Sequence, residues 1–353
     1  MIPSNNAGSR RCCLLRQMVW LLAVGLVCGN SSAFPARAAE KGSIMVEKVE
    51  YHGWKNNLRL GNGDVELIIT LDVGPRIISY RLANGKNVFK NYADHLGKSG
   101  EKDWQIRGGH RLWVGPEDLT RTYALDNGPV RYQQEGNKVR LTPAADAAYG
   151  IQKEMVVELE PRGSRVTILH RIRNIGQAAT ELAPWALTVM APGGVEIIPL
   201  PPKRPHPGPP QNARSPKDYA ANQLMAIWPF FDFTDPRWHF GSKYITLRQD
   251  AMKGPTKIGL AHRMGWVAYL NEGSLFVKRF GYEEGKPYPD HGVNFETFTN
   301  EDMLEIESLG PLVHLTPGKD VEHTEHWELI GNVQRFEDEA GIDRNVRSKL
   351  LPK

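Results

Sequence analysis

The sequence predicts an all-β protein, and three observations lead to that prediction. Apolar residues recur with a period of two over many short segments, turns that contain Gly or Pro separate these segments, and long amphipathic helical patterns are absent before residue 334. A period of two is that of a strand with one buried face. Many short strands joined by such turns indicate a sandwich or a barrel.

The strands are predicted in chain order from this alternation. The segment 65–73 (VELIITLDV) places its apolar residues Val65, Leu67, Ile69, Leu71 and Val73 on one face. Two further alternating segments, 154–160 and 165–174, are separated by the turn 161–163 (PRG). More strands are expected at 243–249, 266–270, 274–280, 293–299, 303–309 and 322–330. Asn271-Glu272-Gly273 is a hairpin-type connection between two of them.

The first 38 residues read as a secretory signal peptide. Arginines precede an uncharged run, MVWLLAVGLVC, and Ala36 and Ala38 fit an A-x-A cleavage site. The run is shorter than the roughly 20 residues that span a bilayer, which favours cleavage over retention as an anchor. We therefore expect a periplasmic or secreted protein, cleaved near Ala38, with no membrane association afterwards.

Removal of this leader changes what the composition implies. All three cysteines (Cys12, Cys13 and Cys28) leave with it, so the remaining chain is expected to have no disulfide and no cysteine-bound metal. The leader also contains four arginines and no acidic residue, which leaves 40 basic against 40 acidic side chains from totals of 44 and 40. A balanced charge gives no reason to expect nucleic acid as a partner.

Residues 39–333 are expected to form one β domain. The stretch 198–218 is rich in proline and cannot be a central strand. Proline-rich composition can mark a domain linker, but strand patterns continue on both sides, so we favour a long ordered surface loop. The polar tail, 334–353, is expected to form a short surface helix or to fray.

The segment 107–118, RGGHRLWVGPED, is the densest cluster of functional groups in the chain. Its two glycines permit a tight turn and a close approach of the backbone to a ligand. Arg107, His110 and Arg111 supply donors, and Trp113 supplies an aromatic surface. The alternative is a β-bulge whose arginines pair with the two acids that follow.

Several other chemistries lack their motifs. The chain has no G-x-S-x-G elbow, no phosphate-binding GxxxxGK[ST] loop and no dinucleotide fingerprint, so we expect no nucleotide cofactor. His323 and His326 resemble a metal pair, but residues three apart on a strand point to opposite faces, so no metal is expected. Among the carboxylates, Glu296 lies in a polar and aromatic setting, whereas Glu305 and Glu307 fit solvent-facing positions better.

The order of five segments resembles the galactose mutarotase-like superfamily. These segments are 74–89 (GPRIISYRLANGKNVF), 105–113 (QIRGGHRLW), 171–176 (RIRNIG), 292–299 (GVNFETFT) and 309–329 (LGPLVHLTPGKDVEHTEHWEL). The resemblance implies a β-supersandwich over roughly residues 45–332. It also implies a carbohydrate ligand, and an aldose 1-epimerase or a hexose-phosphate epimerase as the type of enzyme.

The resemblance also implies roles for individual residues. Arg107 takes the place of the substrate-binding Arg or His of the family, Arg76 lies near the sugar pocket, and Glu296 takes the place of the catalytic base. The family's H-x-Y-F motif, which supplies the acid, is absent. Trp185 lies in that neighbourhood and would stack on a sugar ring. His110 and His291 are alternative acids, and His170 is expected to be a core residue.

Two main functional hypotheses follow from the sequence. The first is an epimerase that acts on a free sugar or uronic acid, with Glu296 as base and Arg76 and Arg107 as substrate-binding residues. The second is a non-catalytic carbohydrate-binding protein in which Trp113, Trp185 and Trp228 are stacking platforms. A structural envelope domain is a third alternative. The hypotheses share one expectation, that Arg107, His110 and Glu296 converge on one concave face.

Overall fold

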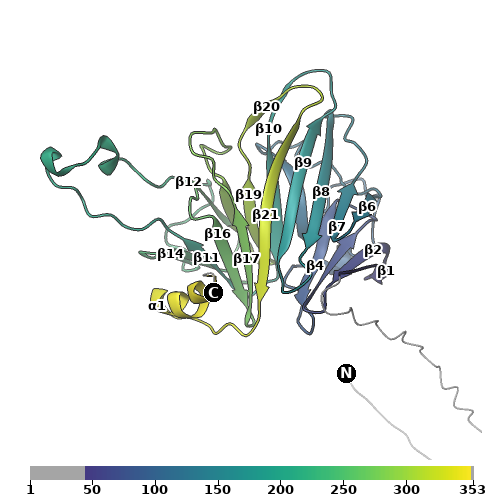
Figure 1. Ribbon diagram of the computed structural model, residues 1–353, viewed down its shortest axis with the longest axis horizontal. Helices are drawn as coiled ribbons and strands as arrows, with labels where there is room; N and C mark the ends of the chain where they lie inside the picture. Colours follow the sequence, from purple (N-terminus) through teal and green to yellow (C-terminus); the bar gives the residue numbers. More distant parts are fainter. Residues whose placement is uncertain (1–43, 351–353) are drawn as a thin grey trace, which may run out of the picture. The chain divides into compact units, whose positions relative to one another are not determined.

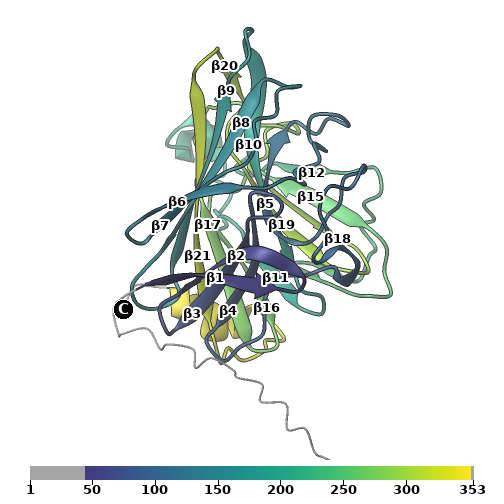
Figure 2. The ribbon, with the colours of Figure 1, turned by 90° about the vertical axis from the view of Figure 1, so that its right-hand side faces the viewer.

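Two large antiparallel sheets make up most of the chain. The computed structural model describes residues 44–350, so the predicted signal peptide lies outside the described residues. Figure 1 shows the sheets as two layers, and Figure 2 shows the same layers turned by 90°. We call them the large sheet and the ten-stranded sheet. This architecture confirms the all-β prediction.

The large sheet has eleven strands, all antiparallel to their neighbours. In order across the sheet they are β1 (Met45–Tyr51), β2 (Trp54–Gly61), β3 (Val65–Thr70), β4 (Arg76–Leu82), β5 (Gly109–Gly115), β10 (Thr180–Met190), β19 (Leu304–Leu309), β18 (Phe295–Thr299), β15 (Thr256–Leu260) and β12 (Met225–Ile227), with β20 (Val313–Leu315) paired to β10. Strands from both halves of the chain therefore lie side by side at β5, β10 and β19.

The ten-stranded sheet packs against one face of the large sheet. Its strands are, in order, β13 (Trp238–Phe240), β14 (Tyr244–Arg248), β11 (Val195–Pro199), β16 (Trp266–Asn271), β17 (Ser274–Phe280), β21 (Asp320–Ile330), β9 (Val166–Asn174), β8 (Ile151–Leu159), β7 (Lys138–Thr142) and β6 (Arg131–Glu135). The main core lies between the sheets, where Leu67 and Ile306 of the large sheet meet Val157 and Trp327 of the other.

The strand predicted at 65–73 ends earlier than its alternation suggests. β3 stops at Thr70, and a shift of register follows Ile68 in its pairing with β4. Leu71 still packs in the main core, but Val73 packs with Trp54 and Ile78 in a separate cluster. Val73 lies beyond the end of the strand, so the last apolar residue of the run packs in a different part of the molecule.

The proline-rich stretch 198–218 lies mostly in an irregular loop, but its first two residues, Ile198 and Pro199, end strand β11. Residues 200–224 follow β11 without forming a strand, and contain only the short helices η2 (Pro210–Asn212) and η3 (Pro216–Asp218). In Figure 1 this teal loop extends away from the sheets. By its contacts, the loop belongs to the same compact unit as the two sheets.

The polar C-terminal segment is helical and partly buried. It contains α1 (Glu339–Ile342), η4 (Asp343–Arg347) and α2 (Ser348–Leu350); one more short helix, η1 (Ala93–His95), lies before β5. Ile342 and Val346 are four residues apart and pack together against Ile197 and Tyr244. Among residues 44–350, no helix has the length and apolar character needed to cross a membrane.

Candidate functional site

The face of the large sheet that points away from the sandwich interior carries the candidate site. In β5, Leu112 and Val114 point into the main core, so Arg111 and Trp113 point to the opposite face. Cross-strand pairing then brings Leu187 and Trp185 of β10 beside these two residues. The next strand places Glu307 opposite Leu187.

The same face continues across the next two strands. Glu296 of β18 lies opposite Glu307, and Phe298 lies opposite Glu305. Lys257 of β15 lies opposite Phe298. Five neighbouring strands, β5, β10, β19, β18 and β15, therefore present aromatic and charged side chains to a single surface.

A cavity of about 320 Å³ lies over this surface. Three aromatic side chains on its floor come from strands: Trp113, Trp185 and Phe298. Four more on its walls come from the connecting segments: Trp104, Tyr123, Trp228 and Phe230. The charged side chains that line it are Arg111, Lys257, Glu117, Glu305 and Glu307.

The aromatic rings brace one another at steep angles. Trp113 and Trp185 have ring centres 5.3 Å apart at 72°, and Trp104 lies 5.3 Å from Trp113. Tyr123 meets Trp104 edge to face at 90°. Edge-to-face contacts of this kind favour a fixed arrangement of the rings. The floor is therefore rigid where it meets the cavity.

One end of the cavity is built around Arg111, and we call it the arginine end. Arg111 Nη2 donates to Glu305 Oε1 at 2.9 Å, and the guanidinium carbon lies 4.3 Å from the Trp113 ring centre. Within residues 44–350, Arg111 Nε and Nη1 and Trp113 Nε1 have no acceptor, although all three atoms are buried. Buried donors without acceptors are unusual and need an explanation.

The other end contains two carboxylates that share one ammonium group, and we call it the carboxylate end. Lys257 Nζ lies 2.6 Å from Glu296 Oε2 and 3.3 Å from Glu307 Oε2. Trp185 Nε1 also donates to Glu307 Oε2 at 2.9 Å. The ammonium lies between the rings of Trp185 and Trp228, 4.9 and 4.6 Å from their centres. Contact with two rings and two carboxylates fixes the position of this lysine.

Burial governs the protonation of this end. Burial raises the pKa of Glu296 well above its ordinary value, and the attraction of Lys257 only partly offsets this. Burial also raises the pKa of Glu307, and here too the attraction of Lys257 offsets only part of the rise. Burial by itself lowers the pKa of Lys257, but the charges of Glu307 and Glu296 raise it overall. The lysine is therefore an ammonium ion, and the carboxyl pair holds a proton more readily than ordinary glutamates do.

The structure separates the six residues chosen from the sequence into four groups. Trp113 and Trp185 line the cavity. Glu296 lies on the cavity face but does not line the cavity, because it is fully buried beside Lys257. The sequence favours solvent-facing positions for Glu305 and Glu307, and this prediction is wrong. Both glutamates are buried and line the cavity.

Arg76 and Arg107 shape the loop before β5 and do not line the cavity. Arg76 Nη1 donates to the carbonyl oxygens of Ile106 and Gly108, at 3.0 and 2.6 Å. Arg107 has a φ of 53°, is buried and pairs with Glu101. A Cβ atom at Gly108 would lie 2.0 Å from the carbonyl oxygen of Lys90. The double glycine therefore serves close packing of the backbone rather than approach of a ligand.

His110 lies on the opposite face of the large sheet from the cavity, which corrects its expected convergence with Glu296. The double glycine suggests a tight turn in 107–118, but Gly109–Gly115 is a strand, so neighbouring side chains alternate between faces. His110 Nδ1 lies 2.9 Å from Thr188 Oγ1, and its Nε2 lies 2.8 Å from Nε2 of His170. His170 is fully buried, as its pattern predicts.

The interior side of the large sheet therefore has a polar cluster of its own. Its members are His110, His170, His323, Lys278, Ser308 and Glu325, and we call it the interior cluster. His170 Nδ1 faces the carbonyl oxygen of His323 at 3.0 Å and must donate to it, so its Nε2 accepts from His110. Glu325 pairs with Lys278 at 2.7 Å.

His110, His170 and Glu325 are close enough to be considered as metal ligands, since their ligand atoms lie within 4.8 Å of one another. Each of these atoms is already used within the protein. The two histidines bond to each other, and Glu325 Oε2 accepts from Trp327 Nε1 at 2.8 Å. The adjacent ammonium of Lys278 would also repel a cation. His323 and His326 do point to opposite faces, one buried and the other exposed.

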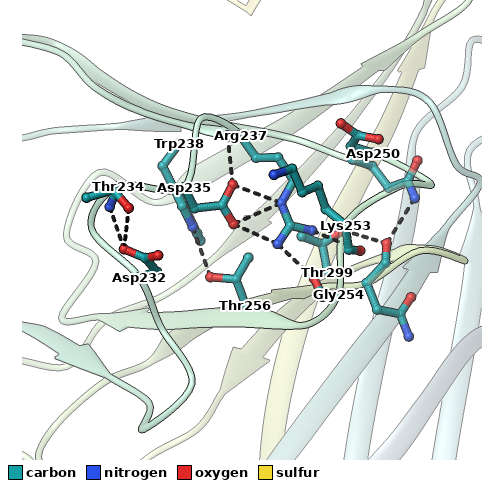
Figure 3. Close-up of polar contacts among 12 residues, drawn as sticks. Asp232, Thr234, Asp235, Arg237, Trp238, Asp250, Lys253, Gly254, Thr256 and Thr299 are labelled. Atoms are coloured by element: carbon teal, nitrogen blue, oxygen red, sulfur yellow. Dashed lines mark hydrogen bonds and ion pairs between the residues drawn. The ribbon is translucent and has the colours of Figure 1, made fainter.

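An arginine clamp anchors the segment that carries Trp228 and Phe230 (Figure 3). Arg237 Nη2 donates to Asp235 Oδ2 and to the carbonyl oxygen of Gly254, both at 2.7 Å. Trp238 Nε1 donates to Thr256 Oγ1 at 3.0 Å, and Thr256 begins the strand that carries Lys257. This wall of the cavity is therefore tied to its charged floor.

The fold has known counterparts among solved structures. No protein-family model matches the sequence, and no similar curated protein was found. The Slr1438 protein from Synechocystis sp. PCC 6803 superposes with a TM-score of 0.53 and 11% identity, over 81% of this chain and 99% of the other. A galactose mutarotase-like protein from Lactobacillus casei ATCC 334 gives 0.51 and 10%, over 78% and 100%.

A third structure, a TPR-domain containing protein from Parabacteroides distasonis ATCC 8503, gives a TM-score of 0.51 with 17% identity; the match covers 80% of this chain and 48% of that one. Identities this low establish the fold alone. The chain is a β-sandwich of two large antiparallel sheets. Its fold resembles that of the galactose mutarotase-like protein from Lactobacillus casei, which is the fold that the order of sequence segments indicates.

Proposed function

We propose that this protein binds a carbohydrate, a sugar or a uronic acid, in the cavity on the large sheet. The observation that carries the proposal is the composition of the cavity, where aromatic rings on the floor and walls surround a few charged hydrogen-bonding groups. Aromatic faces stack on the C–H faces of sugar rings, and charged groups bind hydroxyls. A mostly aromatic pocket with a few fixed polar groups is typical of a small-ligand site.

Size and fold support the same proposal. A volume of about 320 Å³ is near the lower end of the roughly 300–1,000 Å³ of small-ligand sites, which suits a ligand of one or two rings. The likeness of the fold to that of a galactose mutarotase-like protein supports a sugar as the ligand. We also propose that the protein is exported, on the basis of the signal-peptide pattern in residues 1–38.

Binding is tested by titrating neutral sugars and uronic acids and following the fluorescence of the tryptophans that line the cavity. Trp228→Ala removes a wall ring and should weaken binding at least about tenfold, since a central aromatic contact is typically worth that much. Phe233→Ala is the matched control, because Phe233 is 66% exposed and does not line the cavity. Equal effects of the two variants, or no saturable binding, would contradict the proposal.

A second candidate function is interconversion of sugar anomers, and the carboxylate end favours it. Ring opening needs a base that takes the proton of the anomeric hydroxyl and an acid that protonates the ring oxygen as its bond to the anomeric carbon breaks. Glu307 lines the cavity. Glu296 does not line it but pairs with the same ammonium group, that of Lys257. The raised pKa values of both groups suit proton transfer near neutral pH.

This second function is tested by following mutarotation of pure α-anomers by proton NMR. If the protein interconverts anomers, Glu296→Gln and Glu307→Gln should each slow the reaction about 10²–10⁴-fold. Glu301→Gln should not slow it, because Glu301 is exposed on the turn between β18 and β19. If the wild-type protein binds sugars saturably but does not accelerate their mutarotation, the second function is contradicted and the protein is a non-catalytic binding protein.

A further inference from the structure

The arginine end of the cavity carries more positive charge than its own acids neutralise. Arg111 lines the cavity, Arg76 is its cross-strand partner in β4, and Arg107 is close enough to repel Arg76. All three are buried, although only Arg111 reaches the cavity. Glu101 pairs with Arg107, and Glu305 pairs with Arg111. Among residues 44–350, two carboxylates thus pair with two of the three guanidinium groups, and Arg76 has hydrogen bonds to backbone carbonyls but no ion pair with an acid.

Neighbouring acids do not supply the missing partner. The charge of Asp126 also acts on Arg76, but Asp126 forms its ion pair with Lys153, at 2.9 Å. Glu117 lines the cavity but is exposed, so solvent screens its charge. Burial lowers the pKa of Arg76 to about 9, and repulsion from Arg111 and Arg107 adds to the effect. An uncompensated buried charge is costly, and such groups gather at functional sites.

The donors without acceptors lie at the same end. Arg111 is held between Trp104 and Trp113, with its guanidinium carbon 5.6 and 4.3 Å from their ring centres. Its Nη2 is used by Glu305, but Nε and Nη1 are not used, nor is Nε1 of Trp113, within residues 44–350. Two independent features, excess charge and unused donors, therefore point to an anion with oxygen acceptors.

We infer that the ligand is an acidic sugar, a uronic acid, whose carboxylate lies at Arg111 while its hydroxyls face the carboxylate end of the cavity. This inference rests on the proposed function and narrows it. A carboxylate fits better than a phosphate, because one excess positive charge matches a monoanion. A dianion would face Glu305 and Glu307 without enough cations to balance it.

The test is a comparison of three probes on the full-length protein. Galactose, galacturonate and galactose 6-phosphate share one ring, and the glucose series repeats the comparison with another. Calorimetric titration should show that the uronate binds at least about tenfold tighter than the neutral sugar. That preference should shrink as the salt concentration rises, since part of it is electrostatic.

Two variants with opposite expected effects keep the test decisive. Arg111→Gln should reduce the preference for the uronate to within about threefold, because the charge and two free donors are lost. Glu305→Gln should increase the preference, because it removes an acid and frees Arg111 Nη2. Lys86→Gln is the control for Arg111→Gln, because it removes the same charge from a side chain that is 83% exposed and outside the cavity. It should leave the preference for the uronate unchanged.

The outcomes separate the two proposals. Equal binding of galactose and galacturonate, or a preference that Arg111→Gln leaves intact, would overturn the uronic-acid inference while carbohydrate binding stands. Tighter binding of the 6-phosphate would overturn the choice of carboxylate. Binding of no probe in either series would overturn both proposals.

Discussion

The two faces of the large sheet carry two buried charged clusters that differ in how completely their hydrogen bonds are satisfied. Residues 110 and 111 are neighbours in β5, yet His110 belongs to the interior cluster and Arg111 to the cavity. In the interior cluster, Lys278 pairs with Glu325 and donates to the carbonyl oxygens of Ala186 and Ile306, at 3.2 and 3.0 Å. On the cavity face, Arg111 and its neighbours retain unused donors.

The difference indicates two purposes for buried charge in one protein. A cluster whose donors and acceptors are matched within the protein joins the two sheets and needs no ligand. A cluster with unmatched donors beside a cavity is completed by something that binds there. If this distinction is correct, changes to the interior cluster mainly reduce stability, and changes to the cavity face mainly reduce binding.

The largest effect is expected from Lys278→Met. The substitution leaves Glu325 buried without its counter-ion, which typically costs about 3–5 kcal/mol of unfolding free energy. Urea denaturation followed by circular dichroism measures it. Adding Glu325→Gln to the same chain should recover part of the loss, because the unpaired charge is gone. A loss no greater than that of Arg111→Gln would erase the proposed difference between the faces.

The next largest effect is expected in the pH dependence of the unfolding free energy, because the histidines of the interior cluster are buried. Burial lowers the pKa of His323 to about 3, whereas in the unfolded chain it remains near 6.5. Below pH 6.5 the unfolded chain therefore gains a proton that the folded protein does not take up, so stability falls as pH falls toward 3. Raised carboxyl pKa values, such as that of Glu196 at about 8, act in the opposite direction between pH 8 and 4.5.

A single substitution isolates the histidine contribution. Between pH 6.5 and 4.5 the wild-type protein should lose roughly 2 kcal/mol more unfolding free energy than His323→Gln, because His323 goes from half to nearly full protonation in the unfolded chain and stays unprotonated in the folded protein. Urea unfolding at several pH values gives both slopes. Parallel slopes would mean that folded His323 does titrate and that the interior cluster is less isolated from solvent than the structure indicates.

A matched pair of tryptophan substitutions compares the two faces of the large sheet directly, with a smaller expected change in unfolding free energy. Trp327 Nε1 donates to Glu325 on the interior side, whereas Trp113 Nε1 on the cavity face has no acceptor within residues 44–350. Replacement by phenylalanine removes the same atoms from two nearly equally buried rings. Trp327→Phe should therefore cost about 2 kcal/mol more than Trp113→Phe, the value of a hydrogen bond to a charged group. Equal thermal shifts would contradict the assignment of the unused donor.

Much of the fold could be predicted from the sequence, because alternation along one strand is a local property. It identified the all-β class, and it explains why His323 and His326 point apart. Applied to Gly109–Gly115, the same rule would also have separated His110 from Arg111. Gly108 and Gly109 indicate a tight turn there instead, because glycine permits backbone conformations that other residues resist. The glycines are needed where the backbone packs against Ile77 and Lys90, a contact with residues far away in the sequence.

The composition of the cavity could be predicted only in part. Trp113 and Trp185 were identified from the sequence, but Lys257, Glu305 and Glu307 become neighbours only through the order of β10, β19, β18 and β15. Trp104 and Tyr123 lie in irregular segments, where no periodicity indicates a direction. Burial also gives the glutamates their altered protonation, and burial depends on the whole fold.

The most direct test of the central claim is thermal unfolding with and without a saturating uronate, galacturonate or glucuronate, in three proteins. A ligand that completes the cavity face should raise the midpoint temperature of the wild-type protein through its binding free energy. Trp327→Phe, altered only on the interior side, should melt lower but show the same ligand-induced rise. Arg111→Gln should lose most of that rise. An equal rise in Arg111→Gln and the wild-type protein, or its loss in Trp327→Phe, would contradict the division of the sheet into an interior face and a ligand face.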